Sequence, residues 1–207
     1  MRERVVIPKE EAAYLAVASP LLKEVATLLF DTGMRPDELH RMQWQEITWS
    51  GARHGTIMIT TGKATAARRQ IPMTKRVPLV LEYGWKTQGK RTEGWAWSSA
   101  TRTGHIDHST VKKQHRKALK DSKVSPFVLY SLRHTFLTRL GASGCDVWTL
   151  MRAAGHSSIA ISSRYVHPHE DSVLAAVERI AVSGSDNFRD SRKRPRREPA
   201  KKLSVRL

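Results

Sequence analysis

The segment Gly155-His156-Ser157-Ser158-Ile159-Ala160-Ile161-Ser162-Ser163-Arg164-Tyr165 places a tyrosine nine residues after a histidine. A second segment lies a short way upstream and reads Tyr130-Ser131-Leu132-Arg133-His134. Helical spacing puts Tyr130 and Arg133, three residues apart, on one edge of a helix that can face a cleft. The two segments therefore predict a single site in the C-terminal part of the globular region.

The side chains of this predicted site suit chemistry on a phosphodiester. Cleavage without a metal requires a nucleophile, positive donors for the phosphate oxygens and an acid for the leaving alkoxide. Tyr165 offers a phenol, whose pKa neighbouring guanidinium groups would lower. Arg35 and Arg133 can bind phosphate oxygens with two donors each, and His156 can add a hydrogen bond. Lys63 can reach the leaving oxygen as the general acid.

Composition favours a polyanionic partner, with nucleic acid the first candidate. The 207 residues are 40% hydrophobic, enough for one ordinary domain, and 36 Lys and Arg against 19 acidic residues give a net charge of +17. The single cysteine excludes an internal disulfide framework and any Cys-rich zinc site. We expect no metal and no cofactor. Without a signal-peptide pattern or a long apolar run, we expect a cytoplasmic, nucleoid-associated prokaryotic protein with no membrane contact.

Periodicity predicts a mainly helical fold with a small antiparallel β-hairpin. Ser19 and Pro20 open a helix that Gly33 closes, which leaves Arg35 just beyond its end and Glu38 on the same face as Arg35. Strands are expected at 56–61 and 70–73, with Lys63 near the tip of the hairpin. Further helices are expected from about residue 74, and at 109–120, 129–140, 146–154, 157–166 and 173–180.

At this point the chain resembles the catalytic domain of the tyrosine recombinases, the phage integrase family, over residues 4–181. The family's boxes are similar to Thr32-Gly33-Met34-Arg35-Pro36-Asp37-Glu38-Leu39, to Lys63 with Arg69-Gln70-Ile71-Pro72-Met73, to Ser131-Leu132-Arg133-His134-Thr135-Phe136, and to Gly155-His156-Ser157-Ser158 with Arg164-Tyr165. Four boxes in the family's order make a specific match.

The resemblance implies a site-specific DNA recombinase. Arg35, Lys63, Arg133, His156 and Tyr165 would be catalytic, together with Tyr130 in the place of the family's histidine, and Tyr165 would be the nucleophile that forms a 3′-phosphotyrosine. Glu38 would support the site. The family's partner is double-stranded DNA, bound by a tetramer whose protomers exchange a C-terminal helix, here residues 172–181. A type IB topoisomerase-like enzyme and a catalytically weak DNA-binding module are the alternatives.

The chain departs from the family in two places. Tyr130 stands where the family usually has a histidine, and the catalytic boxes begin within 35 residues of Met1. A phenol at position 130 keeps a hydrogen bond to phosphate but loses the titration of an imidazole near pH 7. We expect a catalytic domain at 1–182 without the family's N-terminal core-binding domain. A basic tail at 183–207 follows, whose composition predicts disorder.

Each candidate also has a structural interpretation. Arg35 and Arg133 could be surface ion-pair partners, with Glu38 the obvious mate of Arg35. Tyr165 alone could be a packing residue, His156 could cap a helix after Gly155, and Lys63 could be a solvated hairpin lysine. Tyr130 could equally be a core phenol, and His134 is expected to pack or to hydrogen-bond within the core rather than to act on substrate.

Overall fold

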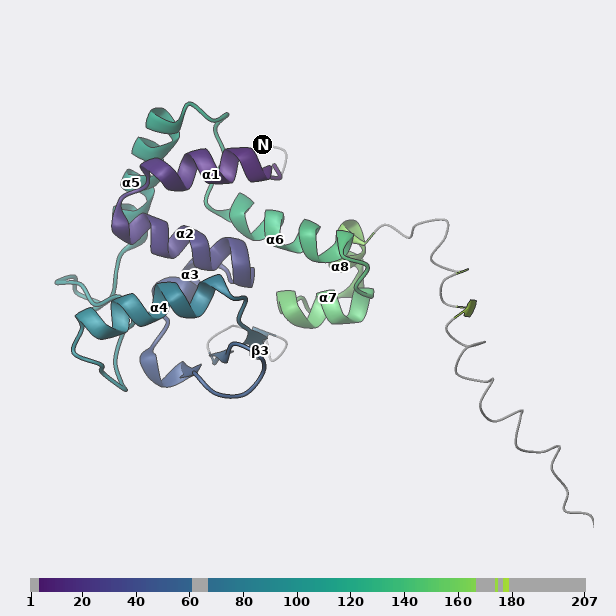
Figure 1. The fold of residues 1–207 in the computed structure, drawn as a ribbon, viewed down its shortest axis with the longest axis horizontal. Coiled ribbons are helices and arrows are strands. Elements are labelled where there is room, and N and C mark those ends of the chain that lie inside the picture. The colour runs from purple at the N-terminus through teal and green to yellow at the C-terminus, as the bar shows by residue number, and fades with distance from the viewer. Residues whose placement is uncertain (1–3, 61–66, 167–173, 175–176, 179–207) are drawn as a thin grey trace, which may run out of the picture. The chain divides into compact units, whose positions relative to one another are not determined.

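The computed structural model describes residues 4–60, 67–166, 174 and 177–178. The chain divides into two units, Met1–His167 and Pro168–Leu207, and nearly all the described residues belong to the first. That unit is mainly helical, with one three-stranded antiparallel sheet among its described residues (Figure 1). The expected fold class is confirmed. No described helix is long and apolar enough to span a membrane.

Two consecutive helices, α1 (Pro8–Val17) and α2 (Pro20–Thr32), open the fold, and each begins with proline, whose fixed φ suits the first helical position. The helix α2 is the expected one, and Gly33 ends it in a left-handed conformation with φ of 61°. A side chain there would also collide with Phe136, so both the backbone conformation and the close packing require glycine at this position. The helix α1 is additional to the expected elements.

The sheet follows α3 (Pro36–His40) and a short 3₁₀ turn, η1 (Trp44–Glu46). Its strands are β1 (Ile47–Thr48), β2 (Thr56–Ile59) and β3 (Arg69–Pro72), in that spatial order, with Ile57 opposite Ile71. The expected hairpin is therefore confirmed as β2 and β3. The strand β1 is additional to it.

The remaining elements are helical and follow the expected ranges closely. They are α4 (Arg76–Thr87), α5 (His108–Ser122), α6 (Tyr130–Ala142), α7 (Val147–Ala154), α8 (Ile159–Ser162) and the 3₁₀ turn η3 (Ser163–Tyr165). The carboxylate of Asp146 caps α7 by accepting hydrogen bonds from the backbone N–H groups of Trp148 and Thr149. The helix expected at 173–180 lies largely outside the described residues.

Helix α6 is the element that connects the parts of the site. It packs against α2, α7 and η3, and Figure 1 shows α2 and α7 next to it. Its residues from Ser131 to Thr135 are all buried, because the main hydrophobic core lies on the α2 side and a smaller cluster around Leu137 and Leu150 lies on the α7 side. A polar side chain on α6 can therefore reach both α2 and α7.

Candidate active site

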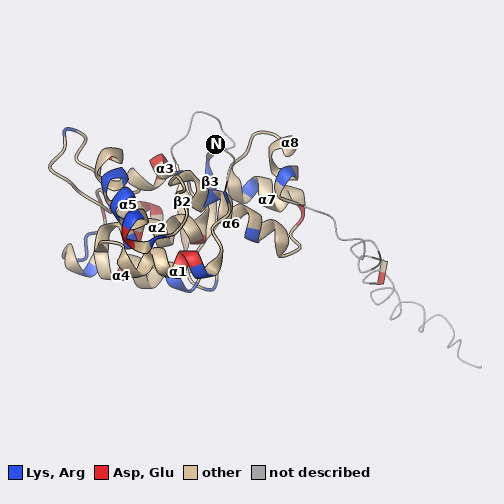
Figure 2. Cartoon of the chain, turned by 90° about the horizontal axis from the view of Figure 1, so that it is seen from above, with Lys and Arg blue, Asp and Glu red and all other residues tan. Residues whose placement is uncertain are grey.

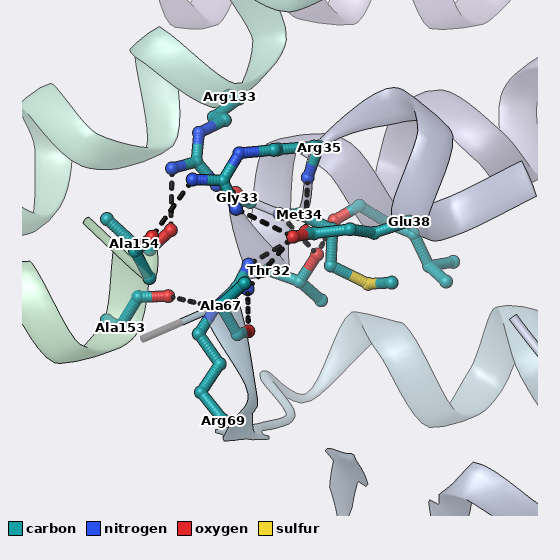
Figure 3. Close-up of polar contacts among 12 residues, drawn as sticks. Thr32, Gly33, Met34, Arg35, Glu38, Ala67, Arg69, Arg133, Ala153 and Ala154 are labelled. Atoms are coloured by element: carbon teal, nitrogen blue, oxygen red, sulfur yellow. Dashed lines mark hydrogen bonds and ion pairs between the residues drawn. The ribbon is translucent and has the colours of Figure 1, made fainter. Parts of the chain in front are cut away.

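Arg35 lies at the junction between α2 and α3, where the chain leaves Gly33 and turns into the next helix. As the N-cap residue of α3, it donates its backbone N–H to Glu38 Oε2 at 2.8 Å. Its guanidinium donates to Glu38 Oε1 at 2.7 Å through Nη1 and to the carbonyl of Gly155 at 2.9 Å through Nη2 (Figure 3). The side chain is 33% exposed, so this cation is reachable from solvent.

Arg133 is fully buried on α6 beside Arg35 (Figure 3). Its Nη1 donates to the carbonyl of Gly33 and its Nη2 to the carbonyl of Ala154, each at 2.6 Å, and its buried Nε has no hydrogen-bond partner. Burial, followed by the charge of Arg35, lowers the pKa of Arg133 to about 10, so it remains a cation at neutral pH. Within the described residues no carboxylate forms an ion pair with it. The expectation of a surface ion pair is therefore wrong for Arg133.

Glu38 neutralises two arginines of the site at once. Besides Arg35, it accepts hydrogen bonds from Arg69 Nη1 at 3.0 Å and Arg69 Nη2 at 2.9 Å. Burial alone would raise the pKa of Glu38, but the hydrogen bonds and charge of Arg69, with those of Arg35, bring it below its ordinary value. The carboxylate is therefore ionised at neutral pH and holds both guanidinium groups in place.

Arg69 is a site residue that the sequence did not single out. Its side chain is only 2% exposed, and it also donates to the carbonyl of Ala153 at 2.8 Å and to that of Ala67 at 2.9 Å. It thus ties β3 to α3 and to the end of α7 (Figure 3). The available signal was strand alternation, since Arg69 and Ile71 share the buried face of β3.

His156 is positioned by the end of α7. Gly155 closes that helix with φ of 64°, and a Cβ atom there would lie 2.8 Å from Arg69 Nη1. The backbone N–H of His156 donates to the carbonyl of Met151, whereas Nδ1 of its side chain lies 2.9 Å from Ser162 Oγ on α8. The side chain therefore does not cap the helix.

The imidazole of His156 is neutral at physiological pH. Burial lowers its pKa to about 4, and the positive charges of Arg133, Arg35 and Arg69 act in the same direction. If the hydroxyl of Ser162 donates to Nδ1, the proton of the neutral ring is on Nε2, which can then donate to a ligand. This tautomer suits binding of a phosphate oxygen.

Tyr165 ends η3 and is half-buried against α6. Its hydroxyl lies 2.5 Å from Nδ1 of His134, and its ring stacks on His134 and His156 with centroid distances of 5.8 Å and 6.3 Å. Close packing fixes the backbone here as well, because a Cβ atom on Gly141 would lie 1.9 Å from the Tyr165 carbonyl oxygen. The structure thus places the candidate nucleophile beside two imidazoles.

Tyr130 begins α6 and is 41% exposed, so the interpretation as a core phenol is wrong. Its ring meets that of His134 edge-on at 5.0 Å. Together with Arg35 it lines a cavity of about 530 Å³ between α3 and α5.

Lys63 lies outside the described residues. Among those residues, no three His, Cys, Asp or Glu side chains are grouped to hold a metal ion.

Solved structures share this mainly helical fold with a small antiparallel sheet. The crystal structure of XerA recombinase matches 94% of the chain, and 66% of its own length, with a TM-score of 0.67 at 19% identity. The catalytic domain of bacteriophage HP1 integrase matches 84% of the chain and 93% of its own length, with a TM-score of 0.63 at 18% identity. The fold is that of a tyrosine recombinase catalytic domain.

Sequence relatives agree with the fold. The chain belongs to the phage integrase family, whose model matches residues 10–171. A tyrosine recombinase of Pseudothermotoga lettingae is 27% identical over 162 residues, which cover 76% of this chain and 53% of the relative. The tyrosine recombinase XerD of Rhizobium meliloti is 27% identical over 151 residues, 70% of this chain and 46% of the relative. The chain spans about half the length of these curated relatives.

Proposed function

We propose that residues 1–182 form the catalytic domain of a site-specific tyrosine recombinase that cleaves and rejoins double-stranded DNA. One observation carries the proposal. The cation of Arg133 is buried beside that of Arg35, and among the described residues no carboxylate forms an ion pair with it. Arg35 also binds the carbonyl of Gly155, and the next residue, His156, contacts Tyr165. A buried unpaired cation is costly, and a bound phosphate would offset that cost.

The two guanidinium groups retain the donors that a phosphate needs. Each carries five N–H donors, and protein oxygens take two of them in Arg35 and two in Arg133. Because the carbonyls of Gly33, Ala154 and Gly155 hold the groups in place, little reorganisation accompanies binding. Such preorganised donors stabilise the charge that develops on the phosphate oxygens in the transition state.

In the proposed reaction, Tyr165 attacks the scissile phosphorus and forms a 3′-phosphotyrosine. The bond to the 5′ oxygen breaks, and Lys63 is the candidate acid that protonates this oxygen. Arg35, Arg133 and His156 hold the non-bridging oxygens, and Tyr130, which lines the cavity with Arg35, adds a hydrogen bond. Attack by a 5′-hydroxyl on the phosphotyrosine reverses the step, so the bond energy is conserved without a metal or cofactor.

Double-stranded DNA is the proposed partner, and the basic face of α5 is its proposed path. Figure 2 shows Lys and Arg gathered on this helix, and the exposed ones are Lys112, Lys113, Arg116, Lys117 and Lys120. Lys112 and Arg116 also line the cavity that holds Arg35 and Tyr130. One neighbour in fold, the Tn1549 transposon integrase, was solved in complex with transposon right end DNA. Phosphate contacts of this kind make binding depend steeply on salt.

The tail at 183–207 would add affinity that is independent of DNA sequence. It holds nine basic and three acidic residues. Deleting it should flatten the dependence of DNA affinity on salt concentration, measured by fluorescence anisotropy. An unchanged slope would contradict this part of the proposal.

We further propose a tetramer on DNA, held through residues 172–181. In this segment Leu174 and Val177, three residues apart, are helical and more than half exposed, which leaves an apolar edge for a neighbouring protomer. Replacing both with serine should leave monomer binding to one site intact and abolish the four-protomer complex in analytical ultracentrifugation. The cellular place that fits this activity is the cytoplasm, at the nucleoid.

A nicked suicide duplex tests the catalytic proposal. Cleavage near the nick releases a short fragment and traps the covalent protein–DNA adduct, which should form with the wild-type protein and disappear in Tyr165→Phe. Intact binding without adduct would instead identify a catalytically weak DNA-binding module. Relaxation of a supercoiled plasmid without recombination between two sites would identify a topoisomerase-like enzyme.

A further inference from the structure

Helix α6 carries an imidazole that touches the proposed nucleophile. Tyr130 and His134 are four residues apart and share a face of the helix, with their rings in edge-to-face contact at 5.0 Å. Tyr130 occupies the place where the family's second box usually has a histidine. One turn further along, Nδ1 of His134 lies 2.5 Å from the hydroxyl of Tyr165. His134, one turn after position 130, is thus an imidazole of α6 that contacts the candidate nucleophile.

A tyrosine nucleophile needs a proton acceptor, because a phenol with a pKa near 10 is almost wholly protonated at neutral pH. The acceptor must lie within hydrogen-bond reach of the hydroxyl, and His134 does. His156 is less suited, because its Nδ1 is engaged by Ser162 and burial among arginines lowers its pKa to about 4. Glu38 already accepts from Arg35 and Arg69.

We propose that His134 is the general base that takes the phenolic proton from Tyr165 during strand cleavage, an inference that rests on the proposed recombinase function. In the step, Tyr165 Oη forms a bond to phosphorus, the bond from phosphorus to the 5′ oxygen breaks, and the phenolic proton moves to Nδ1 of His134. The 5′ oxygen takes its proton from the separate acid, for which Lys63 is the candidate. Religation returns both protons to their donors.

The surroundings of His134 determine when this transfer is favourable. The described titratable and charged groups near it include the phenols of Tyr130 and Tyr165, the imidazole of His156 and, adjacent on α6, the guanidinium of Arg133. The negative charge that develops on the phosphate in the transition state favours an imidazolium beside it, so bound substrate assists the transfer.

Single-turnover cleavage of the nicked suicide duplex at saturating protein tests the proposal. His134→Ala should slow adduct formation by roughly 10²- to 10⁴-fold, the usual contribution of a general base, while DNA affinity stays unchanged. Added imidazole should restore part of the rate, because it can enter the space that the side chain leaves. His134→Gln, which keeps a hydrogen-bond acceptor of similar size and cannot take a proton, should be slow and insensitive to imidazole.

The chain offers a matched control in the core, where the hydroxyl of Tyr14 lies 2.7 Å from Nδ1 of His115. His115→Ala also breaks a buried tyrosine–histidine bond, so it reports what the loss of packing does. The rate at which this variant cleaves the duplex, corrected for the folded fraction measured by circular dichroism, should not respond to imidazole. A duplex with a bridging 5′-sulfur, whose leaving group needs no acid, should leave the His134→Ala defect unchanged, because the missing group is a base.

The outcomes separate this proposal from the one on which it rests. If the wild-type protein forms no Tyr165-dependent adduct, both fail. If it does, and His134→Ala cleaves within about threefold of the wild type or loses activity that imidazole does not restore, only the role of His134 is overturned. Rescue of His134→Ala by the 5′-sulfur substrate would instead assign His134 to the leaving group. If His134→Ala does not fold, an unimpaired His134→Gln overturns the proposal by itself.

Discussion

Replacing Arg69 with methionine should destabilise the protein more than its position on a short edge strand suggests. The change keeps the length of the side chain but removes a guanidinium that is 2% exposed and makes four hydrogen bonds, two of them to Glu38. Removing one partner of a buried ion pair typically costs about 3 to 5 kcal/mol, because the other charge remains buried. Glu38 keeps Arg35, so we expect about 3 kcal/mol.

The loss should depend on pH in a defined direction. In the wild type the pKa of Glu38 is lowered, so the stability that it contributes is present above its ordinary pKa and is lost as pH falls through the folded-state value. Without Arg69, the effect of burial on Glu38 is less fully offset and its pKa rises, so protonation then removes a charge that only Arg35 balances. The difference between Arg69→Met and wild type should therefore be largest near pH 7 and shrink toward pH 4.

Urea unfolding followed by circular dichroism at pH 7 and pH 4.5 measures both effects. The control is Lys86→Met, which breaks the exposed pair with Glu82 at 3.0 Å on α4 and should cost no more than about 0.5 kcal/mol. If Arg69→Met costs no more than this control, or if its cost grows on acidification, the account of a buried charge network around Glu38 is refuted.

Two further predictions concern packing and acid stability. Gly141→Ala should displace the Tyr165 backbone and lower both stability and adduct formation. Gly84→Ala in α4, where the nearest atoms lie 3.9 Å from a Cβ atom, should be neutral or stabilising by up to about 1 kcal/mol. Equal melting temperatures of the two variants would contradict this prediction. Burial lowers the pKa of His40 to about 4, so wild type should lose about 3 kcal/mol from this residue between pH 6.5 and 4. His40→Leu should flatten that slope in urea unfolding, and parallel curves would contradict it.

Much of the helical fold could be predicted because its signals are local. The apolar face of α2, its closing Gly33 and the capping carboxylate of Asp146 each act within one or two turns, and both helices, α2 and α7, appear where expected. The strand β1 has no such signal, because its two residues are defined only by pairing with β2. The helix α1 was missed because its few buried residues do not form an apolar stripe along it.

Most residues of the site could be predicted from the sequence, but the hydrogen bonds and ion pairs between them could not. The spacing of motifs singled out Arg35, Arg133, His156 and Tyr165, and the structure brings all four together. Arg69 belongs to the predicted hairpin, but its place in the site depends on which face of β3 meets Glu38. The contact of His134 with Tyr165 depends on how η3 packs against α6, which brings together residues 31 apart in the sequence.

The sequence by itself determined the chemical inventory: a phenol, two guanidinium groups, an imidazole and a strongly basic surface. These follow from residue type and from spacing along one helix or turn, which local rules govern. Only the tertiary structure decided that Arg133 reaches the carbonyl of Gly33, 100 residues away, and that Arg69 shares Glu38 with Arg35. Such contacts join segments that are distant in the sequence, so they depend on how α6 packs against α2 and α7. That packing brings the separate side chains together into one site.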